Sequence, residues 1–340
     1  MASITEVARL AGVSTATASR VVAEVDYPVS AATRERVLAA ARELDYVPNA
    51  LARGLLKSTV PIVGVMVHDI TDPYFNEVVR GVEDAATTAG YLVITCSSDR
   101  DPERQNSYAR LLRSLRAAAV IFAGSGIADS DANEELARHV AGIRANGSAV
   151  VHLSPHADGP PDVGVDNVAG IAAMVAALVE LGHTRIAFLA GPQTLLVARE
   201  RLEGYLCGIA DASVAIDERL IVNTGFDRAG GAAGVDQLIA RGVEFSAICC
   251  ANDLLALGAL QRLAELGRAV PGDVSVAGFD DISIAALSAP HLSTVRLPLR
   301  EMGRRGFDSA MRTLAGETVA PETLPTQVVM RDSTARRNSQ

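Results

Sequence analysis

Residues 4–22 read ITEVARLAGVSTATASRVV, and this stretch predicts two short helices joined by a tight turn. Ser3 and Glu6 have the spacing of a capping box, which predicts the start of the first helix. Gly12 predicts its end, because glycine adopts the left-handed exit conformation without steric cost. Ser14 predicts the cap of the second helix.

The second of these helices has one apolar and one polar face. Ala18, Val21 and Val22 recur at helical spacing and predict the buried face. The opposite face carries Thr15, Ala16, Thr17, Ser19 and Arg20. A short polar face that ends in one arginine suits a helix that enters a DNA major groove. The alternative is an ordinary helical hairpin at the end of a globular domain.

The residues that follow extend this predicted head. Ser30 predicts the cap of a third helix over residues 31–44. The apolar face of that helix carries Val37, Leu38, Ala41 and Leu44. The next segment, residues 49–56, spans about two turns and contains Gly54, so it is too short to be a stable helix alone in water. We expect it to fold only when it binds DNA.

From residue 60 the pattern changes to apolar strands that alternate with helices. Strands are predicted over residues 61–67, 91–95, 120–123 and 149–153, and again over residues 186–190, 247–250 and 274–277. Continuous apolar strands separated by helices predict parallel sheets covered on both faces. The turn cluster at residues 156–161 predicts a boundary between two lobes. Two such lobes usually bind a small ligand in the cleft between them.

The bulk composition limits the class of protein. The chain has 340 residues, is 49% hydrophobic and carries a net charge of −9, which excludes a wholly basic coat protein. Residues 1–58 are close to neutral, so a small head is joined to an acidic body. No apolar run is long enough to span a bilayer, and no signal peptide is recognisable, so we expect a cytoplasmic protein with no membrane partner. The cysteines form no CxxC pattern, and we expect mostly buried, reduced thiols.

The sequence lacks the usual motifs for catalysis and cofactor binding. No GxGxxG follows a strand, and there is neither a P-loop nor a GxSxG nucleophile elbow. His152 and His156 have the spacing of metal ligands, but Pro155 lies between them and no acidic partner follows in pattern. Asp280 and Asp281 form a carboxylate pair without a general acid or nucleophile. We therefore expect no cofactor, no metal and no enzymatic activity.

Polar and aromatic side chains gather instead after the predicted strands. They are Asp69, Tyr74, Phe75, Ser125, Arg201, Phe226, Asn252 and Asp280. Carboxylates and amides bind paired hydroxyl groups of sugars, arginine donates a planar fork, and aromatic rings cover the C–H face. These residues predict a sugar-binding cleft. Asp253 and Asp280 could alternatively cap the helices that follow them, and for Asp253 we expect the cap.

Seven short motifs occur in a fixed order along the chain. They are ITEVARLAGVS, TASRVV, VSAATRERVLAAARELDYVPNALARGL, GPQTLL, RERLEG, ANDLLALGAL and VSVAGFDD. With this ordered set, the chain resembles the LacI/GalR family of repressors over nearly its whole length. The resemblance implies an N-terminal all-α helix-turn-helix head and a two-lobed α/β core with doubly wound parallel sheets, like that of periplasmic sugar-binding proteins.

The resemblance also implies domain boundaries. The DNA-binding head would occupy residues 1–48, the hinge helix residues 49–58, the effector-binding and dimerisation core residues 59–330, and a tail residues 331–340. Lobe 1 would comprise about residues 59–163 and 293–325, and lobe 2 about residues 164–292, with crossovers near Val163, Leu292 and Thr326. The tail is polar and we expect it to be loose. It lacks the apolar heptads that make some relatives tetramers, so we expect a homodimer.

Family positions assign the DNA-binding residues. The expected set is Ser14, Thr15, Ala16, Thr17, Ser19, Arg20, Ser30, Thr33, Asn49 and Leu55. Within it, Thr15, Ala16 and Arg20 match base-reading positions, and four hydroxyl side chains match phosphate contacts. Leu55 matches a leucine that relatives insert into the minor groove. A two-fold dimer with these residues needs a pseudo-palindromic operator in double-stranded DNA.

Family positions also sharpen the expected cleft. Arg201, Asn252 and Asp280 stand in the R-L-x-G, A-N-D and G-[YF]-D-D motifs, at positions that contact the effector in relatives. Leu153 and Leu195 stand where some relatives have a sugar-binding aspartate and a second arginine, so we expect a less polar pocket and no purine effector.

We therefore predict a dimeric transcriptional repressor whose operator affinity is controlled by a small-molecule effector, a sugar or sugar derivative. The alternatives are a solute-binding protein without DNA function and a cleft enzyme. The head disfavours the first, and the missing catalytic constellation disfavours the second.

Overall fold

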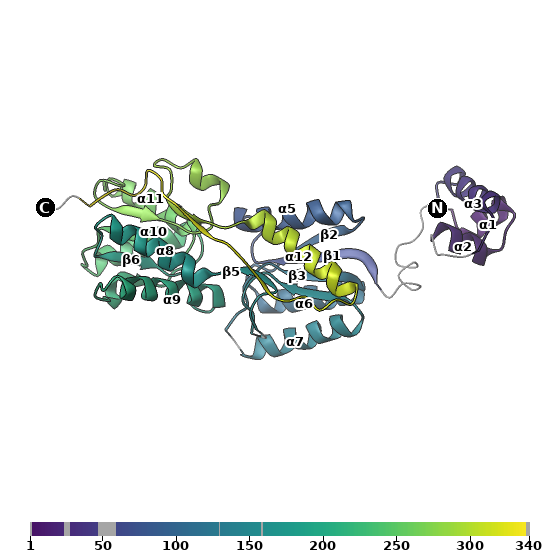
Figure 1. The fold of residues 1–340 in the computed structure, drawn as a ribbon, viewed down its shortest axis with the longest axis horizontal. Coiled ribbons are helices and arrows are strands. Elements are labelled where there is room, and N and C mark those ends of the chain that lie inside the picture. The colour runs from purple at the N-terminus through teal and green to yellow at the C-terminus, as the bar shows by residue number, and fades with distance from the viewer. Residues whose placement is uncertain (1, 24–27, 47–58, 129, 158, 338–340) are drawn as a thin grey trace.

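The structure is a computed structural model that describes residues 2–23, 28–46, 59–128, 130–157 and 159–337. It contains a small helical unit near the N-terminus and a core of two α/β lobes (Figure 1). The predicted hinge, with Asn49, Gly54 and Leu55, lies outside the described residues.

Three helices form the head: α1 Ile4–Ala11, α2 Thr15–Val22 and α3 Ala31–Glu43. The capping box between Ser3 and Glu6 is present, and Gly12 ends α1 in the left-handed conformation with φ 65°. Val7, Ala18, Val21 and Val37 are among the buried residues that hold the three helices together. The expected apolar face of α3 was partly wrong, because Leu38 is exposed and Ala40 takes its place in the core.

Lobe 1 is built on a four-stranded parallel sheet with the order β2-β1-β3-β4. The strands are β1 Val60–Val67, β2 Leu92–Ser97, β3 Ala117–Phe122 and β4 Ala149–His152. The helices are α5 Pro73–Thr88, α6 Pro102–Ser114, α7 Ser130–Ala145 and, from much later in the chain, α12 Leu299–Leu314. The strands β3 and β4 are buried on both faces and are almost continuously apolar, whereas the edge strand β2 is only partly buried.

The helices α5 and α12 approach each other at two glycines. A Cβ atom at Gly81 would lie 2.0 Å from the carbonyl oxygen of Arg300, and one at Gly303 would lie 2.0 Å from that of Val78. Backbone contact of this kind fixes α12 against lobe 1, where Figure 1 shows it beside α5. The return of the chain to lobe 1, implied by the family resemblance, is therefore present.

Lobe 2 has the same architecture, with the strand order β7-β6-β8-β9. Its strands are β6 Ile186–Leu189, β7 Ile221–Val222, β8 Ala247–Cys250 and β9 Ser275–Ala277. Its helices are α8 Asn167–Glu180, α9 Leu196–Asp211, α10 Arg228–Ala240 and α11 Asp253–Glu265. Short 3-10 turns occur at Glu218–Leu220 and Ser283–Ala286. The predicted fold class is confirmed by both lobes together with the helical head.

The chain crosses between the lobes along two short pairs of strands. The strand β5 Val163–Val165 runs parallel to β11 Glu322–Leu324, and β10 Thr294–Arg296 runs antiparallel to β12 Gln327–Val329. These pairs lie at the predicted crossover positions.

The tail is not loose over its described part. Ser333 is fully buried, and its hydroxyl donates to the carbonyl oxygen of Val276 (2.6 Å) and accepts from the backbone N–H of Ser293 (2.8 Å). Further on, the N–H of Arg337 donates to the carbonyl oxygen of Leu181 (2.8 Å). The expectation of a loose tail was therefore wrong for residues 331–337, which lie along lobe 2.

Of the cysteines, Cys96, Cys249 and Cys250 are buried, as expected, whereas Cys207 is exposed on α9. Within the part of the chain that the structure describes, no helix combines the length and apolar character needed to cross a bilayer.

Candidate functional site

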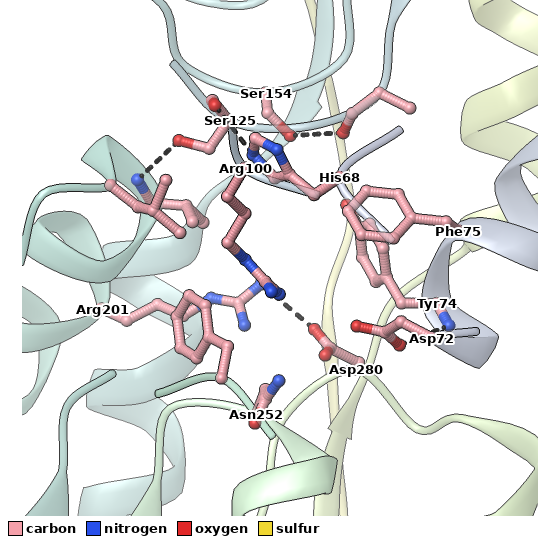
Figure 2. Close-up of a pocket in the computed structure, with 14 residues that line it drawn as sticks. His68, Asp72, Tyr74, Phe75, Arg100, Ser125, Ser154, Arg201, Asn252 and Asp280 are labelled. Atoms are coloured by element: carbon pink, nitrogen blue, oxygen red, sulfur yellow. Dashed lines mark hydrogen bonds and ion pairs between the residues drawn. The ribbon is translucent and has the colours of Figure 1, made fainter. Parts of the chain in front are cut away.

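A cavity lies between the two lobes. From lobe 1 it is lined by His68, Asp72, Tyr74, Phe75, Arg100, Ala123, Ser125 and Ser154, and from lobe 2 by Leu195, Val197, Arg201, Phe226, Asn252 and Asp280. Most of these residues follow the carboxyl end of a strand in one of the two sheets. Figure 2 shows their side chains converging on one space.

The structure brings seven of the eight predicted cleft residues to this cavity; Asp69 is the exception. Its carboxylate instead accepts hydrogen bonds from the backbone N–H (2.8 Å) and hydroxyl (2.7 Å) of Thr71. Asp72 reaches the cavity in its place, at the start of α5. The prediction for Asp69 was wrong because a strand end identifies the loop, but not which of its two aspartates turns inward.

Arg201 is buried and its hydrogen bonds hold it within lobe 2. Its Nε donates to Oδ1 of Asn167 (3.0 Å) and its Nη1 to the carbonyl oxygen of Ala251 (2.6 Å). The guanidinium also lies over the ring of Phe279, 4.2 Å from its centroid. Arg201 lies in the second turn of α9.

Asp280 faces this arginine from the opposite side. Its Oδ1 lies 3.1 Å from Nη2 of Arg201, but the two groups are not aligned as a hydrogen bond, so Oδ1 accepts none. Burial raises the pKa of Asp280 to about 7, although the charge of Arg201 opposes this shift. Asp280 therefore brings to the cavity wall a carboxyl group that is paired with Arg201.

Asn252, and not Asp253, caps α11, and Asn252 also lines the cavity as predicted. Asn252 caps α11, and its Oδ1 accepts the N–H of Leu255 (2.9 Å), which leaves its amide nitrogen on the cavity side. Asp253 is fully buried, and it accepts from the N–H of Ile282 (2.9 Å) and the hydroxyl of Thr294 (2.6 Å). The expectation that Asp253 is the cap was wrong; it ties α11 to β10 instead, and burial raises its pKa well above the usual value.

The lobe 1 wall is aromatic with a polar edge. The rings of Tyr74 and Phe75 meet edge to face with centroids 4.9 Å apart. Nε2 of His68 lies 2.9 Å from the carbonyl oxygen of Ser125. Burial, and next the positive charge of Arg100, lower the pKa of His68 to about 4, so the ring is neutral at physiological pH and donates this hydrogen bond.

Sequence reasoning missed several cavity residues. They are His68, Asp72, Arg100, Ser154 and Val197. Arg100 follows β2 in the same way that the predicted residues follow their strands, so the same rule applied to β2 would have found it. Leu195 lines the cavity, as its departure from the family pattern implied, but Leu153 packs under α12. Lobe 1 contributes a guanidinium, that of Arg100, which the expectation of a less polar pocket did not include.

Backbone groups also join the lobes beside the cavity. The N–H of Val197 donates to the hydroxyl of Ser125 (3.1 Å), and the N–H of Leu196 donates to the carbonyl oxygen of Gly126 (3.1 Å). The N–H of Ala128 donates to the carbonyl oxygen of Thr194 (2.7 Å). These hydrogen bonds connect the two lobes beside the cavity, in addition to the strand pairs at the crossovers.

The head presents the polar face that the sequence predicted. Ser14, Thr15, Ala16 and Arg20 are exposed on α2, and Thr17 and Ser19 are half-buried. Ser14 caps α2 through the N–H of Thr17 (3.1 Å), and Ser30 caps α3 through the N–H of Thr33 (3.2 Å). Hydroxyl groups at two helix N-termini suit contacts with phosphate groups.

The two histidines with metal-ligand spacing form a stacked pair instead. The rings of His152 and His156 are 4.2 Å apart, next to Phe122. Among the described residues, no group of three or more His, Cys, Asp or Glu side chains is placed to hold a metal ion.

Comparisons with known proteins agree with both parts of this arrangement. Residues 3–49 match the family model for bacterial regulatory proteins of the lacI family, and residues 175–334 match a periplasmic binding protein-like domain. The chain is 34% identical to the HTH-type transcriptional repressor PurR of Vibrio atlanticus, over 91% of this chain and 90% of the relative.

Solved structures match over almost the whole chain. A Lac repressor dimer bound to operator and the anti-inducer ONPF is 27% identical, with a TM-score of 0.84, and covers 98% of this chain and 99% of its own. A complex of the transcriptional regulator CelR with cellobiose is 31% identical, with a TM-score of 0.71, and covers 98% and 100%.

A helix-turn-helix head joined to a two-lobed core with an interlobe cavity defines a DNA-binding transcriptional regulator that responds to a small molecule, and not an enzyme. The chain belongs to the LacI family of bacterial regulatory proteins.

Proposed function

We propose that this protein is a dimeric repressor that binds a pseudo-palindromic operator through α2 of each subunit, and that a sugar or sugar derivative in the interlobe cavity controls this binding. The observation that carries the proposal is the cavity itself, since side chains from both lobes line it. A molecule bound there contacts both lobes, so it can favour one relation between them over another. A regulator of bacterial DNA acts where that DNA is, so the proposal places the protein in the cytoplasm.

Relatives support both operator binding by a dimer and control by a bound sugar. The Lac repressor structure is a dimer on its operator, and the CelR structure holds cellobiose. The cavity offers carboxylates, an amide and arginines beside Tyr74, Phe75 and Phe226, a combination that suits a polyhydroxylated molecule.

In the head, we assign base reading to three exposed residues of α2. Thr15 offers one hydrogen bond, Ala16 offers a methyl group for contact with thymine, and Arg20 offers a bidentate fork for guanine. We assign phosphate contacts to Ser14, Thr17, Ser19, Ser30 and Thr33, and minor-groove contacts to the hinge through Asn49 and Leu55.

DNA selection from a random pool with the full chain, followed by gel shifts, tests the proposal. We expect an inverted repeat, and we expect Arg20→Ala to lose discrimination at one base pair of each half-site, by about 1–3 kcal/mol. Arg36→Ala, on the exposed side of α3, is the matched control and should keep the wild-type sequence preference. Recovery of a single asymmetric half-site would contradict the dimeric model.

A further inference from the structure

Arg100 is a charged residue of lobe 1 that lines the cavity. It lies in the turn after β2 with φ 61°, a left-handed conformation that side chains other than glycine rarely adopt. From this turn its side chain extends into the middle of the cavity, toward Arg201 and Asp280 (Figure 2). The strained turn therefore serves to direct a guanidinium inward from lobe 1.

The Nε atom of Arg100 lacks a hydrogen-bond acceptor among the described residues. It is buried without a partner, although the side chain as a whole is half-buried. The charge of Arg100 acts to lower the pKa of Asp69 and Asp72, but the guanidinium forms no ion pair with a described carboxylate. A guanidinium is always charged and carries five N–H donors. A buried donor without an acceptor is unfavourable, so a bound molecule that supplies an acceptor would complete this arrangement.

Two carboxylates share the cavity with the two arginines. Arg201 is matched by Asp280, which lies 3.1 Å away. Asp72 caps α5, where its Oδ1 accepts the N–H of Tyr74 (3.0 Å). Burial raises the pKa of Asp72, and the charge of Arg100 opposes this shift. Among the described residues neither carboxylate forms an ion pair with Arg100, so the guanidinium from lobe 1 is the charged group left for a bound molecule.

We propose that the effector is an anionic sugar derivative, whose carboxylate or phosphate group pairs with Arg100 while its hydroxyl groups bind Asp280 and Asn252. The planar fork of arginine matches two oxygen atoms of either oxyanion. On the other wall, Asp280 and Asn252 line the cavity and the amide nitrogen of Asn252 faces it, so hydroxyl groups find an acceptor carboxyl group and a donor. This inference rests on the proposed function, because it names the class of molecule for the same cavity.

The geometry also assigns Arg100 a role in coupling. It comes from lobe 1, whereas Asp280 and Asn252 come from lobe 2. A molecule with an oxyanion at one end and hydroxyl groups at the other links the lobes, and a neutral sugar of the same size leaves Arg100 unpaired.

Calorimetry with matched compounds tests the inference. The probes are D-glucose, D-glucuronate and glucose 6-phosphate, together with D-galactose and D-galacturonate, titrated into the full-length protein. Arg100→Gln keeps a neutral donor on a shorter side chain and removes the charge, and Arg100→Lys keeps the charge. Arg110→Gln, an exposed position on α6, is the control for loss of one positive charge outside the cavity.

A second experiment tests effectors that are not among these five compounds. A metabolite extract is separated on an anion exchanger into retained and unretained fractions, and each fraction is tested for its effect on operator affinity. We expect activity in the retained fraction only. We also expect the acid or phosphate that binds best to lose about ten- to a hundredfold in affinity in Arg100→Gln, and little in Arg110→Gln. The glucuronate and glucose 6-phosphate arms show which oxyanion the site prefers.

Two results would overturn the inference and leave the proposed function intact. One is activity confined to the unretained, neutral fraction, and the other is an anionic compound that binds Arg100→Gln as tightly as the wild type. If neither fraction changes operator affinity, the proposed function fails and the inference fails with it.

Discussion

At the scale of single residues, the raised pKa of Asp280 makes the free energy of unfolding depend on pH. Asp280 has a pKa raised to about 7, chiefly by burial, against an ordinary value of 3.8. For an acid whose pKa is higher in the folded than in the unfolded state, the folded protein holds the extra proton between the two values. Raising the pH through this window therefore lowers the free energy of unfolding.

This pH dependence predicts a difference in stability between the wild type and Asp280→Asn. Between pH 5 and pH 7 we expect the wild type to lose stability more steeply than the variant, by about 1 kcal/mol per pH unit, since asparagine does not titrate. Urea unfolding at several pH values measures both slopes. Equal slopes in the two proteins would show that Asp280 already titrates near its ordinary pKa in the folded state.

Some of the cavity residues could be predicted from the sequence and others could not. The motifs around Asn252 and Asp280 identified the lobe 2 side of the cavity because each follows a strongly apolar strand, whereas Arg201 was assigned from its family position. Asp69 and Asp72 stand in one loop, and only the hydrogen bonds to Thr71 decide which of them turns away. Arg100 also follows a strand, but β2 is only partly buried and its loop carries no distinctive motif, so the strand-end rule was not applied there.

At the scale of helices and strands, continuous apolar runs and caps predicted most elements to within a few residues. The strands β5 and β11 have only three residues each, which is too short for a periodic pattern to be recognised. The attachment of the tail depends on one buried hydroxyl, that of Ser333, and an isolated serine in a polar stretch gives no such signal.

The contact between α5 and α12 leads to a prediction at this scale. Gly81→Ala places a Cβ atom 2.0 Å from the backbone oxygen of Arg300, so the helices must separate, and we expect a loss of about 1–3 kcal/mol or more. In Gly142→Ala the nearest atoms belong to the flexible end of Arg113, so the higher helix propensity of alanine should leave stability unchanged or raise it. Chemical unfolding of both variants makes the comparison; equal stability would contradict the close packing of these helices.

The attachment of the tail to lobe 2 leads to a second prediction, which concerns thermal stability. A chain that ends at residue 330 loses Ser333, so the buried N–H of Ser293 loses its acceptor, and we expect a lower melting temperature. A chain that ends at residue 337 keeps these contacts and is the control. If both truncated chains melt at the same temperature as the full chain, the tail does not stabilise lobe 2.

At the scale of the whole molecule, the fold separates DNA binding from effector binding. The exposed face of α2 lies in the head, and the cavity lies between the lobes of the core. The family model and the ordered motifs agree on this division, which is why the class of protein could be predicted from sequence. The identity of the effector could not, because it depends on how loops from both lobes converge.

The central claim is that the cavity and the operator are energetically coupled, and linkage provides its most direct test. Operator affinity is measured with and without a saturating effector identified by the experiments above, and effector affinity is measured with and without saturating operator. The account predicts the same factor in both experiments, about fivefold or more, because coupling free energies are reciprocal. An effector that binds the cavity with the same affinity whether or not operator is present would contradict the account.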